Sequence, residues 1–428
     1  MKPIILTFTT YYLPGYRAGG PIRTIANMVE RLSDTFDFRI VALDRDLGDA
    51  SPYPDIRGDA WMARGKALVQ YVSPEGFGLR KIAEIARSTP HDAIYLNSFF
   101  DPRFTQLVLV NHRLGRLCGR PIVIAPRGEF SKGALQLKRF KKSAFIRLAT
   151  WLKLYDGLTW QASSALEAAD IQRAMTVGKR KVGRVGVSGH IAVAPNLADS
   201  GDNASPSVEA GLRYRSDGPL RACFLSRISP MKNLDFALRV LAEVHAPVRF
   251  AIYGPIEDAA YWARCKALIA KLPSHIEVAY EGRVEHAQVV PTLAQHDLFL
   301  FPTHGENFGH VIHEALLAGL PLLISDQTPW QRLTDQGVGW DLPLDDISAF
   351  ARRIEEVAGW PLAEHQQWVA RARALAVQVG EDPVTLEANR HLFLDAIRSA
   401  TLAKSEKGRK GASIDDSTAP TRHIDTEK

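Results

Sequence analysis

Cysteine is scarce in this 428-residue chain, and its placement excludes two kinds of site. The three cysteines, Cys118, Cys223 and Cys265, are odd in number, far apart and never in a Cys-x-x-Cys spacing. We therefore expect neither a disulfide framework nor a structural zinc site. A reducing cytoplasm is the compartment that fits this composition best.

Long apolar runs are also missing. The N-terminal stretch MKPIILTFTTYY has too short an apolar run for a secretory signal peptide. No run reaches the roughly 18 apolar residues that a transmembrane helix needs. The sequence thus predicts a cytoplasmic protein that does not cross a membrane. The full Gly-x-Gly-x-x-Gly fingerprint of nicotinamide enzymes is absent as well.

Charge of one sign is in excess in only one place. The chain has 53 Lys and Arg against 47 Asp and Glu, a net charge of +6, with 46% apolar and 23% charged residues, which is ordinary for a soluble globular protein. Residues 127–153 alone hold eight basic side chains and one acidic one. This segment alone carries +7, so the remainder of the chain is nearly neutral.

The apolar pattern predicts two α/β domains, because the chain is longer than one core usually supports. Short β-rich runs alternate with stretches of helical period, and runs that are apolar on both faces indicate parallel sheets covered on both sides by helices. The runs of the first series are PIILTF, FRIVAL, DAIYLN, PIVIAP, LTWQAS and IAVAP, and those of the second are RACFLS, VRFAIYG, IEVAYEG, DLFLFP and LPLLIS.

Composition places the boundaries between these parts. Residues 200–219 are rich in Ser, Gly, Pro and Asp, which is typical of a linker. We expect domains at 1–199 and 220–380, a helix at 381–401 that packs back on the first domain, and a disordered, charged tail at 402–428. Because ligands of such sheets bind at the carboxyl ends of the strands, the site should lie between the domains.

The segment HGENFGHVIHEALLAGLP, residues 304–321, places Glu306 at the start of an expected helix and Glu314 two turns into it. Their carboxylates would be roughly 12 Å apart if both residues were helical, beyond the about 5 to 9.5 Å of a glycosidase pair. They are better interpreted as separate acceptors for vicinal hydroxyls, beside a helix N-terminus that suits an anion. Two glutamates on a helix surface remain the alternative.

Histidines in the same segment allow a metal site as a lesser alternative. His310 and His313 share one helical face, and His304 is nearby. Their order with Glu314 matches neither His-Glu-x-x-His nor His-x-x-Glu-His. We expect them to line the site or to be packed.

Two further segments could bind an anion. In LSRISPMKN, residues 225–233, Arg227 and Lys232 stand where a strand passes into the next helix, and two such cations suit a diphosphate. A solvated pair of charges is the alternative. In YRAGGPIRT, residues 16–24, Gly19 and Gly20 precede a helix and would let the backbone approach an anionic ligand.

Together these features resemble the retaining GT-B glycosyltransferases of family 4, the glycosyl transferases group 1. The resemblance rests on the Glu306 and Glu314 spacing, on the Arg227 and Lys232 segment, and on glycines of the expected loops, and it covers roughly residues 4 to 400. It implies two Rossmann-like domains facing across a cleft. It also implies transfer of a hexose from a nucleotide sugar to a saccharide or lipid-linked acceptor with retention, in surface polysaccharide or glycolipid biosynthesis.

The resemblance also implies roles for individual residues. Arg227 and Lys232 would bind the diphosphate, Glu314 the ribose and Glu306 the transferred sugar, so Glu306, Arg227 and Lys232 form the expected catalytic set. The expected donor-binding residues are Gly19, Gly20, Gly254, Gly282, Arg283, Asn307, Phe308, Gly309 and Glu314, with Gly282 and Arg283 beside the base. No metal or other cofactor is implied, because side chains and helix ends stabilise the leaving diphosphate.

The first domain departs from the family pattern. Many relatives carry a histidine in a loop of this domain, whereas the corresponding stretches here, LNSFFDP and APRGEFSKG, offer Asn97, Arg127 and Glu129 as weaker candidates to contact the sugar or the acceptor. The usual Pro-Asn-Gly at the end of the domain is Pro195-Asn196 without the glycine.

The basic segment predicts an amphipathic helix over residues 133–155. Its apolar stripe is Leu137, Phe140, Ala144, Leu148, Trp151 and Tyr155, and the charges off the stripe are Lys138, Arg139, Lys141 and Lys142. Such a helix could rest on the anionic inner face of a membrane and meet a lipid-linked acceptor. A domain helix with its stripe in the core is the alternative, and nucleic acid is not expected as a partner.

Three other functions share these features. A nucleotide-sugar epimerase or a phosphorylase could use the same fold, and a non-catalytic nucleotide-sugar binding protein could retain it. The intact set of Glu306, Glu314, Arg227 and Lys232 favours a catalyst over the binding protein.

Overall fold

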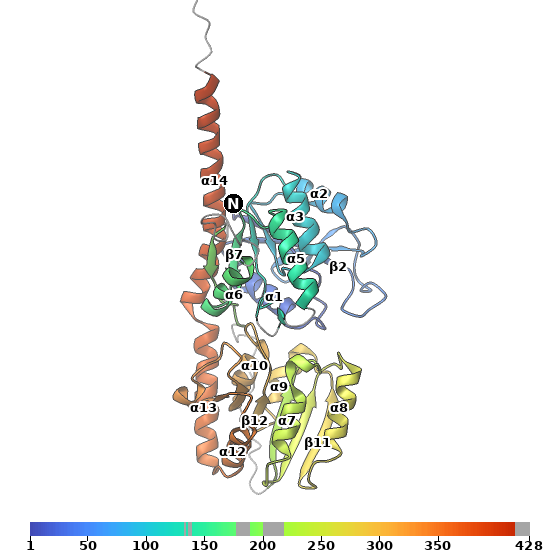
Figure 1. Ribbon diagram of the computed structural model, residues 1–428, viewed down its shortest axis with the longest axis vertical. Coiled ribbons are helices and arrows are strands. Elements are labelled where there is room, and N and C mark those ends of the chain that lie inside the picture. The colour runs from blue at the N-terminus through green and yellow to red at the C-terminus, as the bar shows by residue number, and fades with distance from the viewer. Residues whose placement is uncertain (132–133, 136–138, 177–188, 200–217, 416–428) are drawn as a thin grey trace, which may run out of the picture.

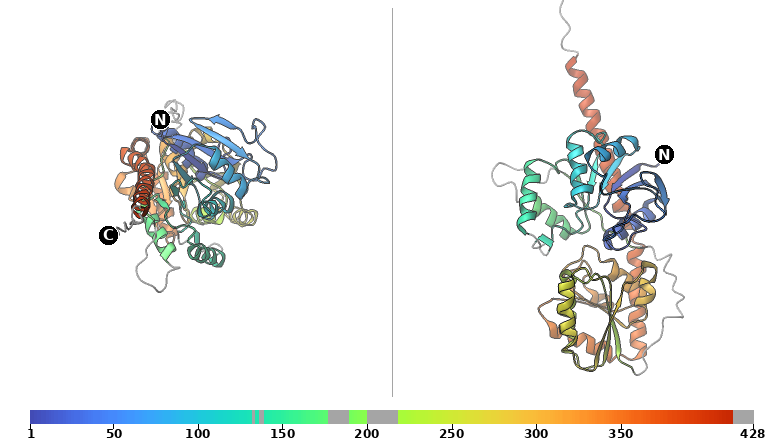
Figure 2. Two further views of the ribbon diagram at one scale, coloured as in Figure 1. Left: turned by 90° about the horizontal axis from the view of Figure 1, so that it is seen from above. Right: turned by 90° about the vertical axis from the view of Figure 1, so that its right-hand side faces the viewer.

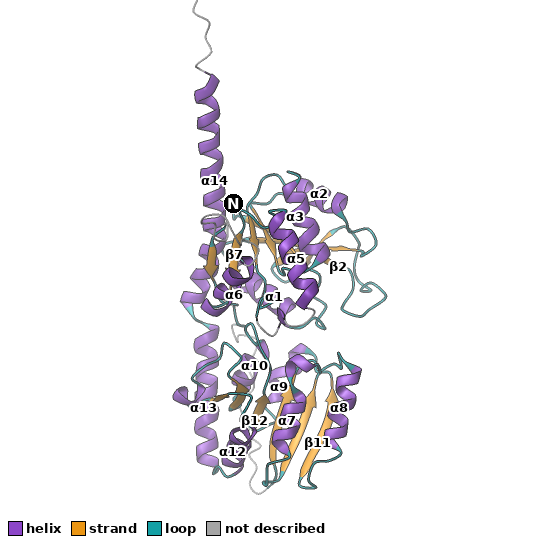
Figure 3. Ribbon diagram, in the orientation of Figure 1, coloured by secondary structure: helices purple, strands orange, loops and turns teal. Residues whose placement is uncertain are grey.

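The computed structural model describes residues 1–131, 134–135, 139–176, 189–199 and 218–415. Two α/β domains lie one beyond the other, and helices of the C-terminal part run along one side of both (Figures 1 and 3). The last strand of the first sheet ends at Val193 and the first strand of the second begins at Leu220. Most of the expected linker, residues 200–217, lies outside the described residues.

The first domain is built on a sheet of order β3-β4-β2-β1-β5-β6-β7-β8, parallel except for the β3–β4 hairpin. Its strands are β1 Ile4–Phe8, β2 Asp37–Leu43, β3 Trp61–Arg64, β4 Ala67–Val72, β5 Ala93–Leu96, β6 Ile122–Ile124, β7 Thr159–Ala162 and β8 Ile191–Val193. Its helices are α1 Gly20–Leu32, α2 Leu79–Ser88, η1 Pro102–Gln106, α3 Leu107–Arg113, α5 Arg139–Trp151 and α6 Ala165–Thr176.

The second domain is built on a parallel sheet of order β11-β10-β9-β12-β13-β14. Its strands are β9 Leu220–Leu225, β10 Val248–Tyr253, β11 Ile276–Gly282, β12 Leu298–Phe301, β13 Leu322–Ser325 and β14 Gly339–Leu342. Its helices are η2 Pro230–Lys232, α7 Leu234–Leu241, α8 Ala259–Ile269, α9 His286–Leu293, α10 His310–Ala318, α11 Leu333–Gln336, α12 Ile347–Ala358 and α13 Leu362–Gly380.

The apolar runs form these strands because both faces of each sheet are covered. In β1, Ile5 packs in the core on one face of the first sheet while Leu6 and Phe8 pack in the core on the other. All of the runs expected from the sequence contain a strand. Strands β3, β4 and β14 were not expected: β3 is only partly buried, and β14 begins at a glycine.

Helix α14, Pro383–Asp415, carries the chain back to the first domain. Asp382 starts it by accepting hydrogen bonds from the backbone N–H groups of Val384 (3.1 Å) and Thr385 (3.0 Å). Phe393 then packs edge-on against Phe36 and Tyr95, with ring centroids 5.5 Å apart in both pairs. The end of the chain is thus part of the core of the first domain.

The expected disorder of residues 402–428 is wrong for its first part, because α14 continues to Asp415. Half of residues 402–415 are alanine, lysine, glutamate or arginine, which are good helix formers and extend a helix that is already nucleated on the domain. Residues 416–428 lie outside the described residues.

Within the described part of the chain, no helix combines the length and the apolar character that crossing a bilayer requires.

Replacing Phe393 by alanine should lower the free energy of unfolding by about 3 to 5 kcal/mol, because it empties a fully buried aromatic site between helix and sheet. Urea unfolding followed by circular dichroism measures the change. Val384→Ala, at a position 74% exposed in the same helix, is the control. Equal midpoints for the two variants would contradict the packing of α14 on the first domain.

Candidate active site

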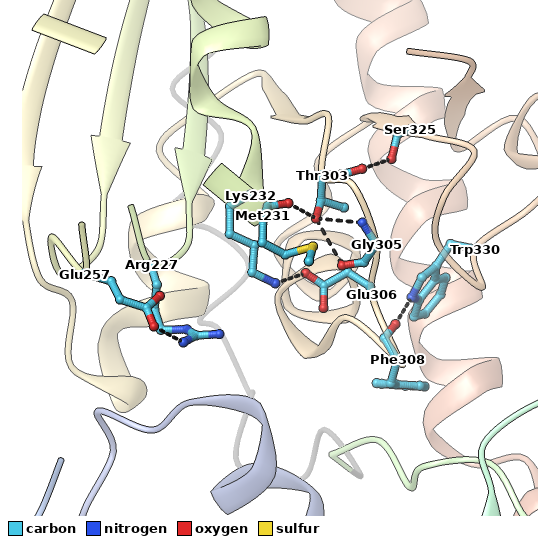
Figure 4. A network of polar contacts seen from close by, with 10 residues as sticks. All are labelled: Arg227, Met231, Lys232, Glu257, Thr303, Gly305, Glu306, Phe308, Ser325 and Trp330. Atoms are coloured by element: carbon cyan, nitrogen blue, oxygen red, sulfur yellow. Dashed lines mark hydrogen bonds and ion pairs between the residues drawn. The ribbon is translucent and has the colours of Figure 1, made fainter. Parts of the chain in front are cut away.

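The ion pair between Lys232 and Glu306 is the centre of the site in the second domain (Figure 4). Lys232 follows β9 and Glu306 follows β12, and these strands are neighbours in the sheet although the residues are 74 positions apart. Lys232 Nζ contacts Glu306 Oε1, and their side chains are 11% and 14% exposed. The carboxyl ends of two adjacent parallel strands thus bring a cation and a carboxylate together, as the position of ligand sites in such sheets predicts.

The loop that carries Glu306 is tied to the turn that carries Lys232. Thr303 Oγ1 lies 3.1 Å from the carbonyl oxygens of both Met231 and Gly305, and the N–H of His304 donates to Met231 O at 2.9 Å. On the other side of the loop, Trp330 Nε1 donates to Phe308 O at 2.6 Å (Figure 4). These contacts fix the backbone on both sides of the carboxylate.

Arg227 lies apart from this pair (Figure 4). Its Nη1 donates to Glu257 Oε1 at 2.8 Å, and the two side chains are 40% and 45% exposed. Gly254 lies in a neighbouring loop at a position that requires glycine. Its φ is +129°, and a Cβ there would lie 1.9 Å from Ser226 O. The N–H of Gly254 in turn donates to Gly282 O at 2.6 Å.

Glu314 lies in α10 at the boundary between the domains. Burial raises the pKa of its carboxyl to about 7; Arg23 from the first domain opposes this rise and Asp199 adds to it. His286 Nδ1 is 3.6 Å from Glu314 Oε1. Burial also lowers the pKa of His286 to about 4, so this imidazole is neutral near pH 7 and supplies no charge to the carboxylate.

Arg23 links α1 of the first domain to this part of the second. Its guanidinium contacts His286 Nε2 and lies 3.7 Å from Asp199 Oδ2. The guanidinium of Arg23 therefore lies near the buried carboxylate of Glu314 and also contacts His286 across the domain boundary. Sequence analysis missed Arg23, although it lies in the quoted Gly19-Gly20 segment; a basic residue one turn into a helix that follows a glycine loop was the available signal.

Of the histidines of the segment, His310 and His313 are packed, whereas His304 is exposed. His310 Nε2 is 2.9 Å from Thr24 Oγ1 of the first domain, and His313 Nε2 is 2.9 Å from Ala376 O. Burial lowers the pKa of both, that of His310 to about 3. Among the described residues, no three His, Cys, Asp or Glu side chains are grouped so that they could hold a metal ion.

A second link between the domains runs through Asn307. Ser163 Oγ is 2.6 Å from both Asn307 Oδ1 and Glu167 Oε2, and Glu167 Oε1 accepts from the N–H of Gly128 at 2.5 Å. Asn307 Nδ2 is buried and has no hydrogen-bond partner among the described residues. A buried donor without an acceptor costs about 1 to 3 kcal/mol, so a ligand oxygen at this position would relieve a cost the free protein carries.

Arg127 contributes the cation on the first-domain side. Its Nε donates to Asn97 Oδ1 at 2.7 Å, and its two Nη atoms contact Asn196 Oδ1 and the hydroxyl of Tyr95. All of these acceptors are neutral, so the positive charge is held in place without being neutralised by them. Asn97 Nδ2, like that of Asn307, is buried without a partner among the described residues.

Comparison with known proteins relates the second domain to one family. Residues 214–374 match the family model of the glycosyl transferases group 1. The matched residues lie mainly in the second domain, which is therefore similar to this family. The chain is also 26% identical over 162 residues to a GDP-mannose-dependent alpha-mannosyltransferase of Mycobacterium tuberculosis (strain CDC 1551 / Oshkosh). That match covers 38% of this chain and 39% of the mannosyltransferase, so it spans about two fifths of the relative.

Solved structures resemble nearly the whole chain. The crystal structure of Anabaena HepE in complex with UDP and glucose has a TM-score of 0.63 at 18% identity, covering 94% of this chain and all of that one. A UDP-forming alpha,alpha-trehalose-phosphate synthase of Burkholderia vietnamiensis has a TM-score of 0.65 at 13% identity, covering 95% and 98%. These likenesses show the fold, and the predicted GT-B architecture is confirmed.

The structure brings together some of the residues predicted to bind the donor and keeps others apart. Lys232 and Glu306 meet, whereas Arg227 is paired with Glu257 and Arg283 is exposed. Gly309 begins α10 with a φ of +79°, a conformation that favours glycine. Phe308 packs between the rings of His310 and Trp330, with centroids 4.9 and 5.6 Å away.

The glycine loop of the first domain lies against the second. Gly19 begins α1 with a φ of +68°, and a Cβ on Gly20 would lie 4.0 Å from the ring of His310. Both glycines therefore stand at the domain boundary, with the N-terminus of α1.

Glu129 differs from its expected role. Its carboxylate accepts from Ser98 Oγ (2.8 Å) and from the N–H groups of Phe99 (2.6 Å) and Phe100 (3.1 Å). Burial raises the pKa of this carboxyl, which these hydrogen bonds oppose. Both oxygens are committed to holding the loop after β5, so Glu129 fixes the residues that follow Asn97 and is not open to a sugar.

The raised pKa of Glu314 predicts a dependence of stability on pH. A carboxyl whose pKa is higher in the folded state stabilises the protein fully below its unfolded pKa of about 4.5, and this contribution is lost as the pH rises through about 7. Between pH 5 and 8 the wild type should therefore lose roughly 1 to 3 kcal/mol more of its unfolding free energy than Glu314→Gln does. Denaturant titrations at the two pH values test this.

The exposed carboxylate of Glu277 provides the control, since Glu277→Gln should leave the wild-type fall in place. If the stability of Glu314→Gln depends on pH in the same way as that of the wild type, Glu314 is not a buried carboxyl with a pKa raised to about 7.

Proposed function

We propose that the protein is a retaining, nucleotide-sugar-dependent hexosyltransferase of family 4. Its acceptor would be a saccharide or lipid-linked sugar, and its role would be in surface polysaccharide or glycolipid biosynthesis in the cytoplasm. The observation that carries the proposal is the buried Lys232–Glu306 pair at the carboxyl ends of β9 and β12, inside a domain similar to the glycosyl transferases group 1.

Lys232 and the start of α10 form the proposed diphosphate site. Free N–H groups in the first turn of a helix attract anions, and Gly309 lets the chain turn sharply into that helix. A bound diphosphate would compete with Glu306 for the ammonium of Lys232. The donor would thereby free the Glu306 carboxylate to accept hydroxyl groups of the transferred sugar. Crystal structures of HepE with UDP and with UDP-glucose support a nucleotide-sugar donor.

Glu314 and Arg23 form the proposed ribose site. An ionised carboxylate can accept two vicinal hydroxyls at once, and Arg23 lies where it can stabilise that ionised form. Gly282 and Arg283, at the end of β11, would then stand beside the base. No metal or other cofactor enters the proposal, since Lys232, Arg227 and the N-terminus of α10 supply the positive charge that the leaving diphosphate requires.

The proposed transfer proceeds with attack on the face from which the diphosphate departs. The bond from the anomeric carbon to the phosphate oxygen breaks, the bond from that carbon to the acceptor oxygen forms, and the acceptor proton passes to the leaving phosphate. Asn97 Nδ2 and Asn307 Nδ2, two buried donors without partners among the described residues, would donate hydrogen bonds to oxygens of the reacting sugars, and Arg127 keeps Asn97 in orientation.

Lys232→Ala and Arg227→Ala should each weaken binding of the nucleoside diphosphate by about 1.5 to 3 kcal/mol, because each removes a charge-assisted contact. Isothermal titration calorimetry measures the change. Arg249→Ala is the matched control for Arg227, since Arg249 forms an ion pair of the same 2.8 Å length with Glu277 on the same sheet, at 62% exposure. Unchanged affinity in both site variants would remove this region from the donor site.

Glu306→Gln and Glu314→Gln should fail in different ways. The first should lower turnover and keep the affinity for the nucleoside diphosphate, whereas the second should weaken that affinity. The loss in Glu314→Gln should grow as the pH rises through about 7, where the wild-type carboxyl becomes ionised. A 2′,3′-dideoxynucleoside diphosphate, which lacks the ribose hydroxyls, should bind wild type and Glu314→Gln equally. If both proteins prefer the ordinary nucleoside diphosphate over the dideoxy form by the same factor, the assignment of Glu314 to the ribose is contradicted.

A further inference from the structure

Helix α5 presents an apolar stripe to solvent. Phe140 is 90% exposed, Trp151 76% and Leu148 53%, and Ala144, between them on the same face, is exposed as well. The helix lies on the outside of the first domain (Figures 1 and 2). Trp151 is the one exposed tryptophan among the eight of the chain, all of which lie in the described residues.

The opposite face of α5 is the one that packs. Ile146 and Ala149 are 7% and 2% exposed, and Phe145 packs against the same core. The alternative of a core-facing stripe is therefore wrong for the described residues, because the stripe and the buried face are different sides of the helix. Tyr155 is also not part of the stripe: it lies past the end of α5 and is buried, with its hydroxyl donating to Phe99 O at 3.1 Å.

The charges around the stripe are positive. Lys141, Arg147 and Lys153 are exposed. Lys142 points inward instead, donating to Ala134 O at 2.7 Å with its ammonium 4.9 Å from the centre of the Phe100 ring. The expected residues Leu137 and Lys138, and the side chain of Arg139, lie outside the described part of the chain.

No described side chain of α5, or of α6 that packs against it, is an exposed carboxylate. The two acids of α6, Glu167 and Asp170, are 6% and 8% exposed. These two helices therefore place no exposed carboxylate beside the stripe.

We propose that the outer face of α5 docks on an anionic lipid bilayer. Tryptophan, phenylalanine and leucine on one side of a short helix, with lysine and arginine at its margins, suit the boundary between acyl chains and headgroups. The positive rim matches anionic headgroups. A second copy of the chain is a poorer occupant, because a two-fold contact between the same faces would bring Lys141, Arg147 and Lys153 of both copies together.

Docking would also orient the site. The chain runs from Arg127, in the site between the domains, through the buried Phe130 to the start of α5 at residue 139. A bilayer under α5 would thus lie next to the first-domain side of the site, where a lipid-linked saccharide could reach it. This consequence rests on the proposed glycosyltransferase function, whereas the docking surface itself does not.

Sedimentation of the full chain with vesicles tests the surface. The wild type should bind vesicles of equal parts phosphatidylglycerol and phosphatidylcholine and should not bind phosphatidylcholine alone. Lys141→Gln and Arg147→Gln should each lower the partition constant about fivefold at low salt, an effect that fades as added salt shortens the Debye length. Phe140→Ser with Trp151→Ser should lower it at every salt concentration.

Matched controls lie elsewhere on the surface. Val377→Ser with Val384→Ser removes exposed apolar side chains from α13 and α14, and Arg352→Gln with Arg398→Gln removes exposed charges. Both should leave binding unchanged. Failure of the wild type to sediment, or equal losses in the controls, would overturn the proposal. So would a dimer in sedimentation velocity that Trp151→Ser dissociates.

A second readout needs no variant. Brominated acyl chains should quench the wild-type tryptophan emission on docking, since Trp151 would then lie at the headgroup boundary; unquenched emission in sedimenting protein would contradict the assigned face. Neither experiment uses a nucleotide. Failure of docking and failure of the proposed transferase activity are therefore separate results.

Discussion

The neighbouring positions of β9 and β12 in the second sheet are the constraint on which the site depends. Parallel pairing of these strands brings their carboxyl ends to one edge, and with them the turn of Lys232 and the loop of Glu306. Thr303 then fixes the loop against that turn. A buried cation and a carboxylate are costly to desolvate and weak as a source of stability, so their retention in this position is better explained by a ligand that separates them.

Charge is distributed between the domains so that neither completes the site alone. The first domain supplies Arg23 near Glu314, and it holds Arg127 with neutral acceptors only. Polar contacts across the boundary among the described residues include Thr24 with His310, Arg23 with His286, Arg31 with the carbonyl of Gly380, and Ser163 with Asn307. Contacts of this kind stabilise one relative placement of the domains weakly, which suits a site that must admit and release a nucleotide sugar.

Sequence patterns predicted most of the fold because strands buried on both faces leave continuous apolar runs. They missed β3, which is only partly buried, its hairpin partner β4, and β14, where Gly339 allows a backbone approach that no apolar pattern records. At the site, the positions of Lys232 and Glu306 after predicted strands were sufficient to indicate that both lie at one edge of the sheet, where the structure brings them together. The partners of Arg227 and Glu129 were not predictable, since each contact joins loops about 30 residues apart through tertiary structure.

Helix α5 is a further case in which the sequence predicted the local pattern and not the tertiary contacts. The spacing of Phe140, Leu148 and Trp151 predicted that they share a face, but not whether a domain core or solvent covers it. Which face is buried depends on tertiary packing: Ile146 and Ala149 face the core of the first domain, and the stripe lies on the other side of the helix.

The central claim is that Lys232, Glu306 and Glu314 hold a nucleotide sugar without a metal ion. A thermal-shift screen of the common nucleoside diphosphates against the full chain, each with and without a chelator, tests it most directly. The account predicts that at least one of them raises the melting temperature and that the chelator does not change the rise. No shift with any nucleoside diphosphate, or a shift that the chelator abolishes, would contradict it.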